Sequence, residues 1–283
     1  MTIRIINISD THLSATHGLF YPNFLKVVDR INAEAPNLVI NTGDIAVNGP
    51  DSDADMAFAA REHQRLNAPL LTLPGNHDIG EEPPGQPAKQ YINAERRARW
   101  HKYFGPDYWA MNVGAWRLIG INSQLMGSGI EAEEPQWEWL ATELAQAQGR
   151  PVGIFQHKPP YREDPDTPHD GFRCMTAAAR ARYAALIEPS TVRFLSCGHS
   201  HVHKKDRWLD RDIYWVPPTS AHEDGNTGLN AYCGYLDWRF DGEDYRVDVV
   251  FPLELERIDF NDMKAGKYER TVDMPVDPPV TAD

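Results

Sequence analysis

This chain of 283 residues repeatedly passes from a short apolar run directly into a polar segment rich in glycine, histidine and acidic residues. Short apolar runs bounded in this way predict buried strands. In an open α/β sheet, ligands bind in the crevice beyond the carboxyl ends of the strands. The pattern therefore predicts that the polar segments meet at one place. In chain order they are Asp10-Thr11-His12, Gly43-Asp44, Gly75-Asn76-His77-Asp78, Gln156-His157 and Gly198-His199-Ser200-His201.

Strand and helix patterns alternate along most of the chain, which favours an α/β layered fold. The last third reads instead as strands only, with Asp241-Gly242 as a hairpin turn, and we expect the second half of the chain to build a second sheet that packs on the first. Strands are predicted at Ile3–Ile8, Leu38–Asn41, Leu70–Leu73, Arg117–Asn122, Val152–Gln156, Val192–Cys197, Ile213–Val216, Ala231–Phe240 and Tyr245–Phe251. Helices are predicted at Phe24–Ala33, Ser52–Leu66, Glu134–Ala147 and Arg173–Ile187.

Residues 80–107 interrupt the alternation with four prolines and a basic, helix-like piece, Glu95–Tyr103. Because this stretch directly follows the Gly75–Asp78 segment, we interpret it as an insertion that overhangs the predicted site. Its cations could guide an anionic substrate or form a solvated helix face. Its aromatic residues could stack on a substrate or form a small core of their own. We expect one domain over residues 1–260 and a C-terminal tail over residues 261–283.

Composition restricts the partners. The formal net charge of -13 argues against polymeric nucleic acid, which needs a basic surface. A small phosphoester remains allowed, because bound metal ions invert the local field. No apolar run approaches the ~20 residues that span a bilayer. The three cysteines lack a C-x-x-C pattern, which favours buried reduced thiols and a cytoplasmic location.

The polar segments contain enough ligands for two divalent metal ions: two carboxylates, one amide and four imidazoles, with His77 left over. In an extended chain Asp10 and His12, two residues apart, point to the same side, and His199 and His201 repeat this spacing. A carboxylate such as Asp44 can bridge two ions, since its oxygens bind independently. Mixed nitrogen and oxygen ligands suit Mn, Fe, Zn or Co.

Two ions roughly 3.5–4 Å apart can clamp a phosphoryl group and lower the pKa of a bound water toward ~7, so that a metal-held hydroxide attacks phosphorus. His77 adjoins a ligand and could protonate the leaving oxygen or stabilise the transition state. Asp78 or a backbone carbonyl could orient it. Gly43, Gly75 and Gly198 precede ligands, where a positive φ or a close backbone approach favours glycine.

Together these segments resemble the calcineurin-like metallophosphoesterase superfamily, whose pattern is D-x-H, G-D, G-N-H-D/E, H and G-H-x-H. The resemblance implies an α/β four-layer sandwich of two packed mixed β-sheets flanked by helices, with a dinuclear metal site at the carboxyl ends of the strands. His77 would contact the phosphate. The ligands of one ion would be Asp10, His12, Asp44 and His201, and those of the other Asp44, Asn76, His157 and His199.

Within the superfamily, the opening Ile8–Leu13 and the chain length are similar to small bacterial phosphodiesterases that act on cyclic nucleotides or glycerophosphodiesters. Phe104–Tyr108 and Ile121–Gln124 instead resemble members that include protein phosphatases. Many small phosphodiesterases read His-His-Pro-Pro where this chain has Lys158 in the second place. Lys158 would add a cation beside the substrate, next to contacts from Asn76 and His77.

The sequence therefore predicts a dinuclear metal-dependent phosphodiesterase for a small diester. A phosphomonoesterase acting on a phosphoprotein or a phosphorylated metabolite is the alternative, and a metal-binding scaffold without turnover is a third reading. An aromatic surface on the insertion would permit a homodimer. Among the remaining histidines, His63 and His101 are expected on the surfaces of helices.

Overall fold

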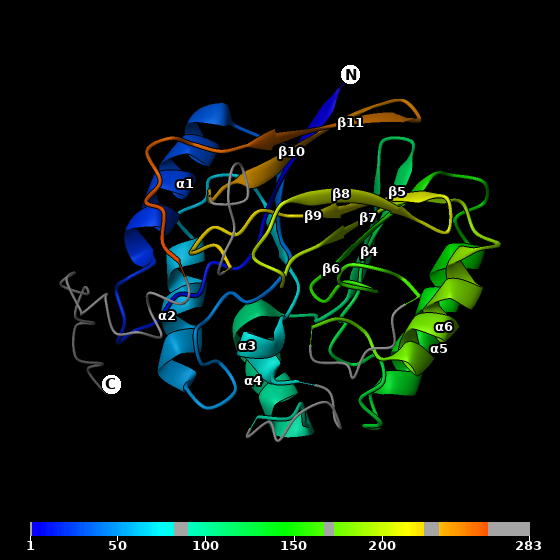
Figure 1. Ribbon diagram of the computed structural model, residues 1–283, viewed down its shortest axis with the longest axis horizontal. Helices are drawn as coiled ribbons and strands as arrows, with labels where there is room; N and C mark the ends of the chain where they lie inside the picture. The colour runs from blue at the N-terminus through cyan, green and yellow to red at the C-terminus, as the bar shows by residue number, and fades with distance from the viewer. Residues whose placement is uncertain (1, 82–89, 167–172, 224–231, 260–283) are drawn as a thin grey trace, which may run out of the picture.

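The computed structural model describes residues 2–81, 90–166, 173–223 and 232–259, which form two facing β-sheets with helices on their outer sides (Figure 1). The first sheet has the order β11-β10-β1-β2-β3. Its strands are β1 Ile3–Ile8, β2 Leu38–Asn41, β3 Leu70–Thr72, β10 Tyr235–Asp241 and β11 Asp244–Val250. The second sheet has the order β4-β5-β6-β7-β9-β8. Its strands are β4 Trp109–Val113, β5 Trp116–Gly120, β6 Val152–Gln156, β7 Val192–Cys197, β8 Lys204–Trp208 and β9 Arg211–Trp215.

Six α-helices accompany the two sheets in the described part of the chain. They are α1 Tyr21–Glu34, α2 Asp53–His63, α3 Asn76–Ile79, α4 Ala94–Phe104, α5 Glu133–Ala145 and α6 Ala177–Ile187. In Figure 1, α1 and α2 lie on the side of the first sheet, and α5 and α6 on the side of the second. Several helices begin where the sequence offers a cap. Ser52 caps α2, Asn93 caps α4 and Thr176 caps α6, each by accepting a hydrogen bond from a backbone N–H three residues on.

Three buried cores separate the layers. In β1, Ile6 and Ile8 pack against α1 and α2, whereas Ile5 faces the second sheet. This alternation follows from the two-residue period of a strand, and it explains why both faces of β1 are apolar. Phe155 and Trp238 meet in the central core between the sheets. The four-layer sandwich expected from the resemblance is confirmed.

The last hairpin corrects one prediction. β10 pairs antiparallel with β1, with Ile3 opposite Phe240, so β10 and β11 extend the first sheet and not the second. The other described strands from the second half of the chain, β6, β7, β8 and β9, do join the second sheet. The pattern of apolar residues places strands along the chain but does not specify which strand a distant hairpin pairs with.

The two edge strands of the second sheet, β4 and β8, were not predicted from the sequence. β8 has the sequence Lys-Lys-Asp-Arg-Trp, and such charged residues are typical of an exposed sheet edge.

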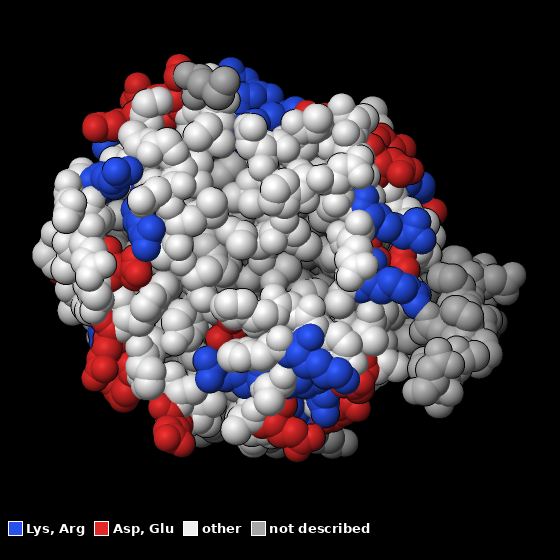
Figure 2. All heavy atoms as spheres, turned by 180° about the vertical axis from the view of Figure 1, so that it is seen from behind, with Lys and Arg blue, Asp and Glu red and all other residues white. Residues whose placement is uncertain are grey.

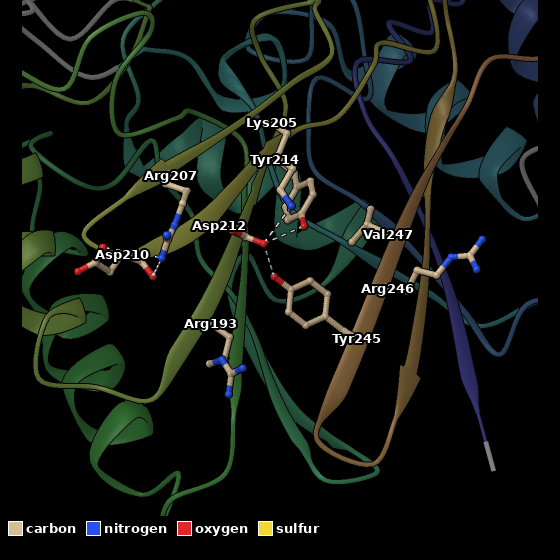
Figure 3. A pocket seen from close by; sticks show the side chains of 9 residues that line it. All are labelled: Arg193, Lys205, Arg207, Asp210, Asp212, Tyr214, Tyr245, Arg246 and Val247. Atoms are coloured by element: carbon tan, nitrogen blue, oxygen red, sulfur yellow. Dashed lines mark hydrogen bonds and ion pairs between the residues drawn. The ribbon is translucent and has the colours of Figure 1, made fainter.

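A polar contact joins the two sheets beside β8. On the neighbouring strand β9, the Asp212 carboxylate accepts hydrogen bonds from the hydroxyls of Tyr214 at 3.1 Å and Tyr245 at 2.9 Å. These residues line a hollow of about 480 Å³ between β8, β9 and β11 (Figure 3). Because Tyr245 belongs to β11 and Asp212 to β9, this contact ties the two sheets together.

The basic helix α4 packs against α2 and α3. Its cations bind acceptors of the protein: the Arg96 guanidinium donates to the Pro50 carbonyl at 3.1 Å, and the Arg97 guanidinium pairs with Asp107 at 2.6 Å. The ring of Trp100 is fully buried in the core beneath α1 and α2. The cations of the described part of the insertion therefore bind the protein itself, and Trp100 joins the core of the first sheet instead of a separate small core.

On the rear of the molecule, charged side chains of both signs lie around the rim and few occupy the middle (Figure 2). Within the described ranges no helix has the length and apolar character needed to span a bilayer. The predicted tail over residues 261–283 lies outside the described residues.

Candidate metal centre

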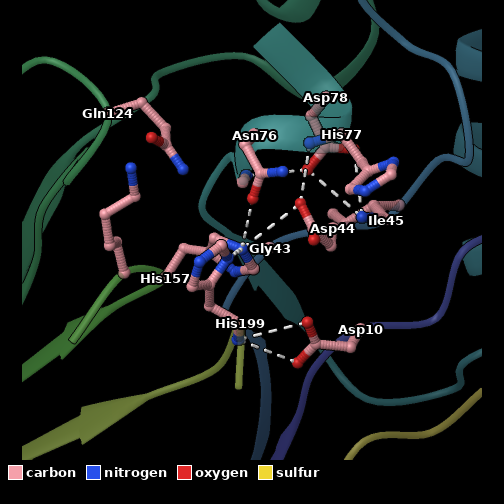
Figure 4. A network of polar contacts seen from close by, with 12 residues as sticks. Asp10, Gly43, Asp44, Ile45, Asn76, His77, Asp78, Gln124, His157 and His199 are labelled. Atoms are coloured by element: carbon pink, nitrogen blue, oxygen red, sulfur yellow. Dashed lines mark hydrogen bonds and ion pairs between the residues drawn. The ribbon is translucent and has the colours of Figure 1, made fainter. Parts of the chain in front are cut away.

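All five polar segments converge at the carboxyl ends of strands that belong to the two sheets. Asp10 follows β1, Asp44 follows β2 and Asn76 follows β3, while His157 follows β6 and His199 follows β7. β1, β2 and β3 run parallel to one another, as do β6 and β7. Their carboxyl ends therefore bring side chains that are up to 189 residues apart in sequence to one place (Figure 4).

The convergent side chains form two groups that could each hold a metal ion. Within each group, one ligand atom per residue lies within 4.8 Å of the others. One group is Asp10, His12, Asp44 and His201, and the other is Asp44, His157 and His199. The Asn76 oxygen lies 3.2 Å from His157 Nε2 and extends the second group. Because Asp44 belongs to both groups, the arrangement fits two neighbouring ions that share one carboxylate.

The separations between donor atoms test this fit. Two ligands of one ion, each ~2.1 Å from it, lie roughly 3.0–3.4 Å apart in octahedral or tetrahedral geometry. Nε2 of His12 lies 3.1 Å from Nε2 of His201. Nδ1 of His199 lies 3.2 Å from Nε2 of His157. These distances match two pairs of imidazole nitrogens that each converge on one ion.

Backbone carbonyls fix the orientation of two of these rings. A carbonyl oxygen can only accept, so His157 donates from Nδ1 to the Thr42 carbonyl at 2.9 Å. In the same way, His201 donates from Nδ1 to the Ala221 carbonyl at 2.5 Å. In both rings the proton on Nδ1 leaves the Nε2 lone pair facing the centre. Such hydrogen bonds orient metal-binding histidines and raise their basicity.

The backbone at the site corrects the extended geometry assumed for the D-x-H and H-x-H segments. Five candidate ligands adopt the left-handed region, which is uncommon outside glycine: Asp10 (φ 54°), His12 (44°), Asp44 (51°), His199 (70°) and His201 (49°). Hydrogen bonds from the amides of Asp10 and His12 to the carbonyls of Gly43 (2.9 Å) and Asp44 (3.0 Å) hold the strained turns. Strain of this kind, of order 1–3 kcal/mol per residue, concentrates at functional sites.

Two different physical reasons explain why glycine precedes the candidate ligands at positions 43, 75 and 198. Gly43 has a φ of +106°, so its backbone conformation itself favours glycine. At Gly75, a Cβ atom would lie 2.1 Å from the Asp44 carboxylate, and at Gly198 it would lie 2.0 Å from the Ser9 hydroxyl. These two positions need glycine because another segment of the site approaches the backbone closely.

Burial and mutual charge perturb the titration of the centre. Burial raises the pKa of Asp10 and lowers that of His12 well below its ordinary value. Burial alone would lower the pKa of His157, but the neighbouring Asp44 carboxylate raises it to about 9. His157 in turn, against the effect of burial, holds the pKa of Asp44 well below its usual range. Metal cations would take the place of such protons when they bind.

His77 lies at the edge of the centre and is partly exposed. Its backbone N–H donates to Asp44 Oδ1 at 2.8 Å, and its ring donates from Nδ1 to the Val47 carbonyl at 2.8 Å. Its ring meets that of His12 edge to face, with centroids 4.7 Å apart. A backbone carbonyl, one of the two predicted alternatives, therefore orients His77.

The Asp78 carboxylate, predicted as one of two groups that could orient His77, instead binds backbone amides. Its fully buried carboxylate accepts hydrogen bonds from the amides of Ala46 (2.8 Å), Gly75 (2.8 Å) and Ile45 (3.0 Å). Burial, with the nearby Asp44 carboxylate, raises the pKa of Asp78 to about 7. Asp78 thus joins the segment that carries Asp44 to the turn that carries Asn76, and it orients backbone rather than His77.

Lys158 has an acidic partner inside the protein that the sequence did not predict. Its side chain is completely buried, and its ammonium lies 2.8 Å from Oε2 of Glu81. Glu81 also bonds through its backbone to Gln90 and Ile92, at the base of the insertion. A lysine at this depth needs such a partner. Lys158 is therefore held in an ion pair inside the protein.

His63 also differs from expectation, because it is buried with 3% of its surface exposed. It occupies the last position of α2 and packs against the ring of Phe24 in α1, with centroids 4.8 Å apart. His101, by contrast, is exposed on α4, as predicted, and pairs with Asp107. The burial of His63 could not be inferred from sequence, because the face that α2 presents to α1 depends on packing.

A family description, calcineurin-like phosphoesterase, matches residues 3–203. This span contains all five polar segments and both groups of candidate ligands. The chain therefore belongs to the calcineurin-like phosphoesterase family and is a hydrolase of phosphoesters.

Three relatives of known name are similar over different parts of the chain. Glycerophosphodiester phosphodiesterase GpdQ from Enterobacter lignolyticus is 28% identical and covers 78% of this chain and 80% of its own length. The cyclic adenosine monophosphate phosphodiesterase CpdA from Escherichia coli is 26% identical, with 77% and 76% covered. The serine/threonine-protein phosphatase CPPED1 from Homo sapiens is 26% identical over 51% of this chain and 45% of its own.

Among solved structures, a dimetal phosphatase from Danio rerio superposes with a TM-score of 0.63. It is 11% identical, and the match covers 87% of this chain and 95% of that one. At this identity the likeness concerns the fold, and it agrees with the two packed sheets described above.

Proposed function

We propose that this protein is a dinuclear metal-dependent phosphodiesterase that hydrolyses a small diester of the cyclic-nucleotide or glycerophosphodiester type. The observation that carries the proposal is the pair of ligand groups that share Asp44. The two relatives named as phosphodiesterases, which cover more than three quarters of this chain, support the diester as substrate.

In this proposal one ion is held by Asp10, His12, Asp44 and His201, and the other by Asp44, Asn76, His157 and His199. The donors are imidazole nitrogens and carboxylate or amide oxygens, a set that suits Mn, Fe, Zn or Co. When bound, the ions would supply Lewis acidity at the phosphoryl oxygens and an activated water. The left-handed turns and the carbonyls of Thr42 and Ala221 hold the ligands ready for this role.

His77 is the proposed catalytic side chain, and Asn76 the second substrate contact. The bond from Nδ1 to Val47 leaves Nε2 of His77 on the partly exposed side of the ring, where the imidazolium form, protonated at both nitrogens, would donate to a phosphoryl or leaving-group oxygen. Asp78 would act indirectly, by fixing the turn from which Asn76 and His77 project. Lys158, paired with Glu81, would support the site from within.

The alternative is a phosphomonoesterase, which the partial likeness to CPPED1 favours. A monoester dianion gains from an additional cation near the phosphate. Lys158 was the candidate for that cation, and its buried pairing with Glu81 weakens this argument. The diester therefore has the stronger support.

We further propose that residues 1–260 act as one domain and that the protein works in the cytoplasm. The cytoplasmic proposal rests on the cysteines, since the structure buries Cys174, Cys197 and Cys233 as thiols.

Steady-state hydrolysis of an aryl phosphodiester and the matching aryl phosphomonoester tests the proposal. Metal-stripped protein is reloaded separately with Mn²⁺, Zn²⁺, Fe²⁺ and Co²⁺, and Asp44→Asn serves as the blank. A kcat/KM ratio strongly in favour of the diester is expected. A ratio in favour of the monoester would replace the proposal by its alternative. Metal binding without turnover of either ester would point to a scaffold.

A further inference from the structure

His63 is the outermost member of a buried chain of hydrogen bonds that reaches the metal centre. The Gly43 amide donates to Asn41 Oδ1 at 3.1 Å. Nδ2 of Asn41 lies 3.0 Å from Nε2 of His63, and Nδ1 of His63 lies 2.8 Å from the Ala59 carbonyl. Asn41 is completely buried. The chain therefore runs from α2 to the turn after β2 without exposure to solvent.

Only one arrangement of protons satisfies this chain. The Gly43 amide can only donate, so the oxygen of the Asn41 amide faces it and the nitrogen faces His63. The Ala59 carbonyl can only accept, so His63 carries its proton on Nδ1. Nε2 is then a lone pair that accepts from Asn41. Burial lowers the pKa of His63 to about 4, which agrees with a neutral ring at physiological pH.

The turn that this chain fixes positions three of the proposed ligands. Asp44 belongs to the turn itself. The carbonyl of Gly43 accepts from the Asp10 amide at 2.9 Å, and the carbonyl of Thr42 accepts from Nδ1 of His157 at 2.9 Å. A rotation of the turn would therefore displace ligands of both ions together.

We propose that His63 is a positioning residue of the metal centre, whose neutral imidazole accepts the hydrogen bond that holds the turn from Asn41 to Asp44 in its metal-binding form. The inference rests on the proposed function, because it takes these residues as ligands. His63 also meets Phe104 of α4 edge to face, with ring centroids 6.5 Å apart. The same imidazole thus lies between the insertion helix and the metal centre.

Metal affinity tests the inference, measured as a Mn²⁺ or Zn²⁺ dissociation constant by competition with a chelator. His63→Leu replaces the imidazole with an apolar side chain and leaves the Asn41 donor without its acceptor. Loss of such an outer hydrogen bond typically weakens metal binding about 10–100-fold, and we expect this range. His63→Gln can offer Oε1 to Asn41, so we expect it to stay within about threefold of the native protein, given that conserved acceptor. His101→Gln on α4 is the matched control and should not change the affinity.

Three results would overturn the inference: native affinity in His63→Leu, an equal loss in both His63 variants, or a loss in His101→Gln. If His63→Leu does not fold, the nitrogen NMR shifts of His63 in the native protein decide instead. The inference requires a neutral ring protonated at Nδ1, and a ring protonated at Nε2 or at both nitrogens would refute it. Native protein that binds no metal would refute the proposed function itself, whatever the His63 variants show.

Discussion

Gly75→Ala should inactivate the enzyme through one added methyl group. Gly75 has an ordinary φ, so alanine would not strain the backbone there. Its Cβ, however, would lie 2.1 Å from Asp44 Oδ1 and 2.7 Å from Nε2 of His157. Ordinary contacts of a Cβ begin at 3.4 Å. The methyl group must therefore displace the proposed bridging carboxylate by more than ~1 Å, whereas metal sites tolerate about 0.2 Å.

The size of the effect follows from this displacement. A misplacement of ~1 Å in a catalytic arrangement can cost about 10²-fold in rate, so kcat/KM for the aryl diester should fall at least about 100-fold. Overpacking of this kind costs about 1–3 kcal/mol in the free energy of unfolding. The folded protein should therefore survive while its metal affinity and activity are lost.

Gly129→Ala supplies the matched control. Gly129 has a φ of +71°, and an added Cβ would meet nothing within 4 Å. Alanine there costs about 1–2 kcal/mol in backbone conformation but leaves the metal centre untouched. Thermal unfolding, metal content and kcat/KM are measured for both variants. If Gly75→Ala keeps its metal and stays within tenfold of Gly129→Ala in kcat/KM, the geometry derived for Asp44 is wrong.

Three further changes test single residues. His77→Gln should lower kcat about 10²–10³-fold, because this is the usual effect of removing a donor to the transition state. The metal content should stay unchanged. Loss of metal would show that His77 is a ligand instead. Lys158→Met should leave Glu81 buried without its partner and lower the free energy of unfolding by about 3–5 kcal/mol, measured in urea. The KM of the ester should not change. A raised KM in a stable variant would make Lys158 a substrate contact. Burial lowers the pKa of His63 from its ordinary value of about 6.5 to about 4 in the folded protein. Between these pH values the folded state binds fewer protons than the unfolded state. The protein therefore loses stability as the pH falls through this range, by up to about 3 kcal/mol. The difference in unfolding free energy between native protein and His63→Gln, measured from pH 7 to pH 4.5, should shrink or reverse as the pH falls, and a constant difference would exclude a neutral buried His63.

Sequence predicted the strands that carry the site better than those at the edges. β1, β2, β6 and β7 have the predicted bounds, because their apolar runs are buried on both faces and end in glycine or polar ligands. The charged strand β8 carries no apolar run, since it lies at an edge of its sheet. The partner of the β10–β11 hairpin was mispredicted because it is a long-range choice that neither strand encodes locally.

At the metal centre, residue types were predictable and local geometry was not. The polar segments identified every residue of the two ligand groups. The left-handed conformation of Asp10 and His12 reverses the simple expectation for a continued strand, because it depends on hydrogen bonds to the segment from Gly43 to Asp44. Likewise, the pairing of Lys158 with Glu81 and the burial of His63 arise from packing between distant segments.

Metal stoichiometry set against turnover tests the central claim most directly. Metal-free protein is titrated with Mn²⁺ or Zn²⁺, and bound metal per chain and hydrolysis of the aryl phosphodiester are measured on the same samples. Two groups of ligands that share Asp44 predict two ions per chain, with turnover reaching its full value only as the second ion binds. Full turnover with one ion or none would contradict the dinuclear account.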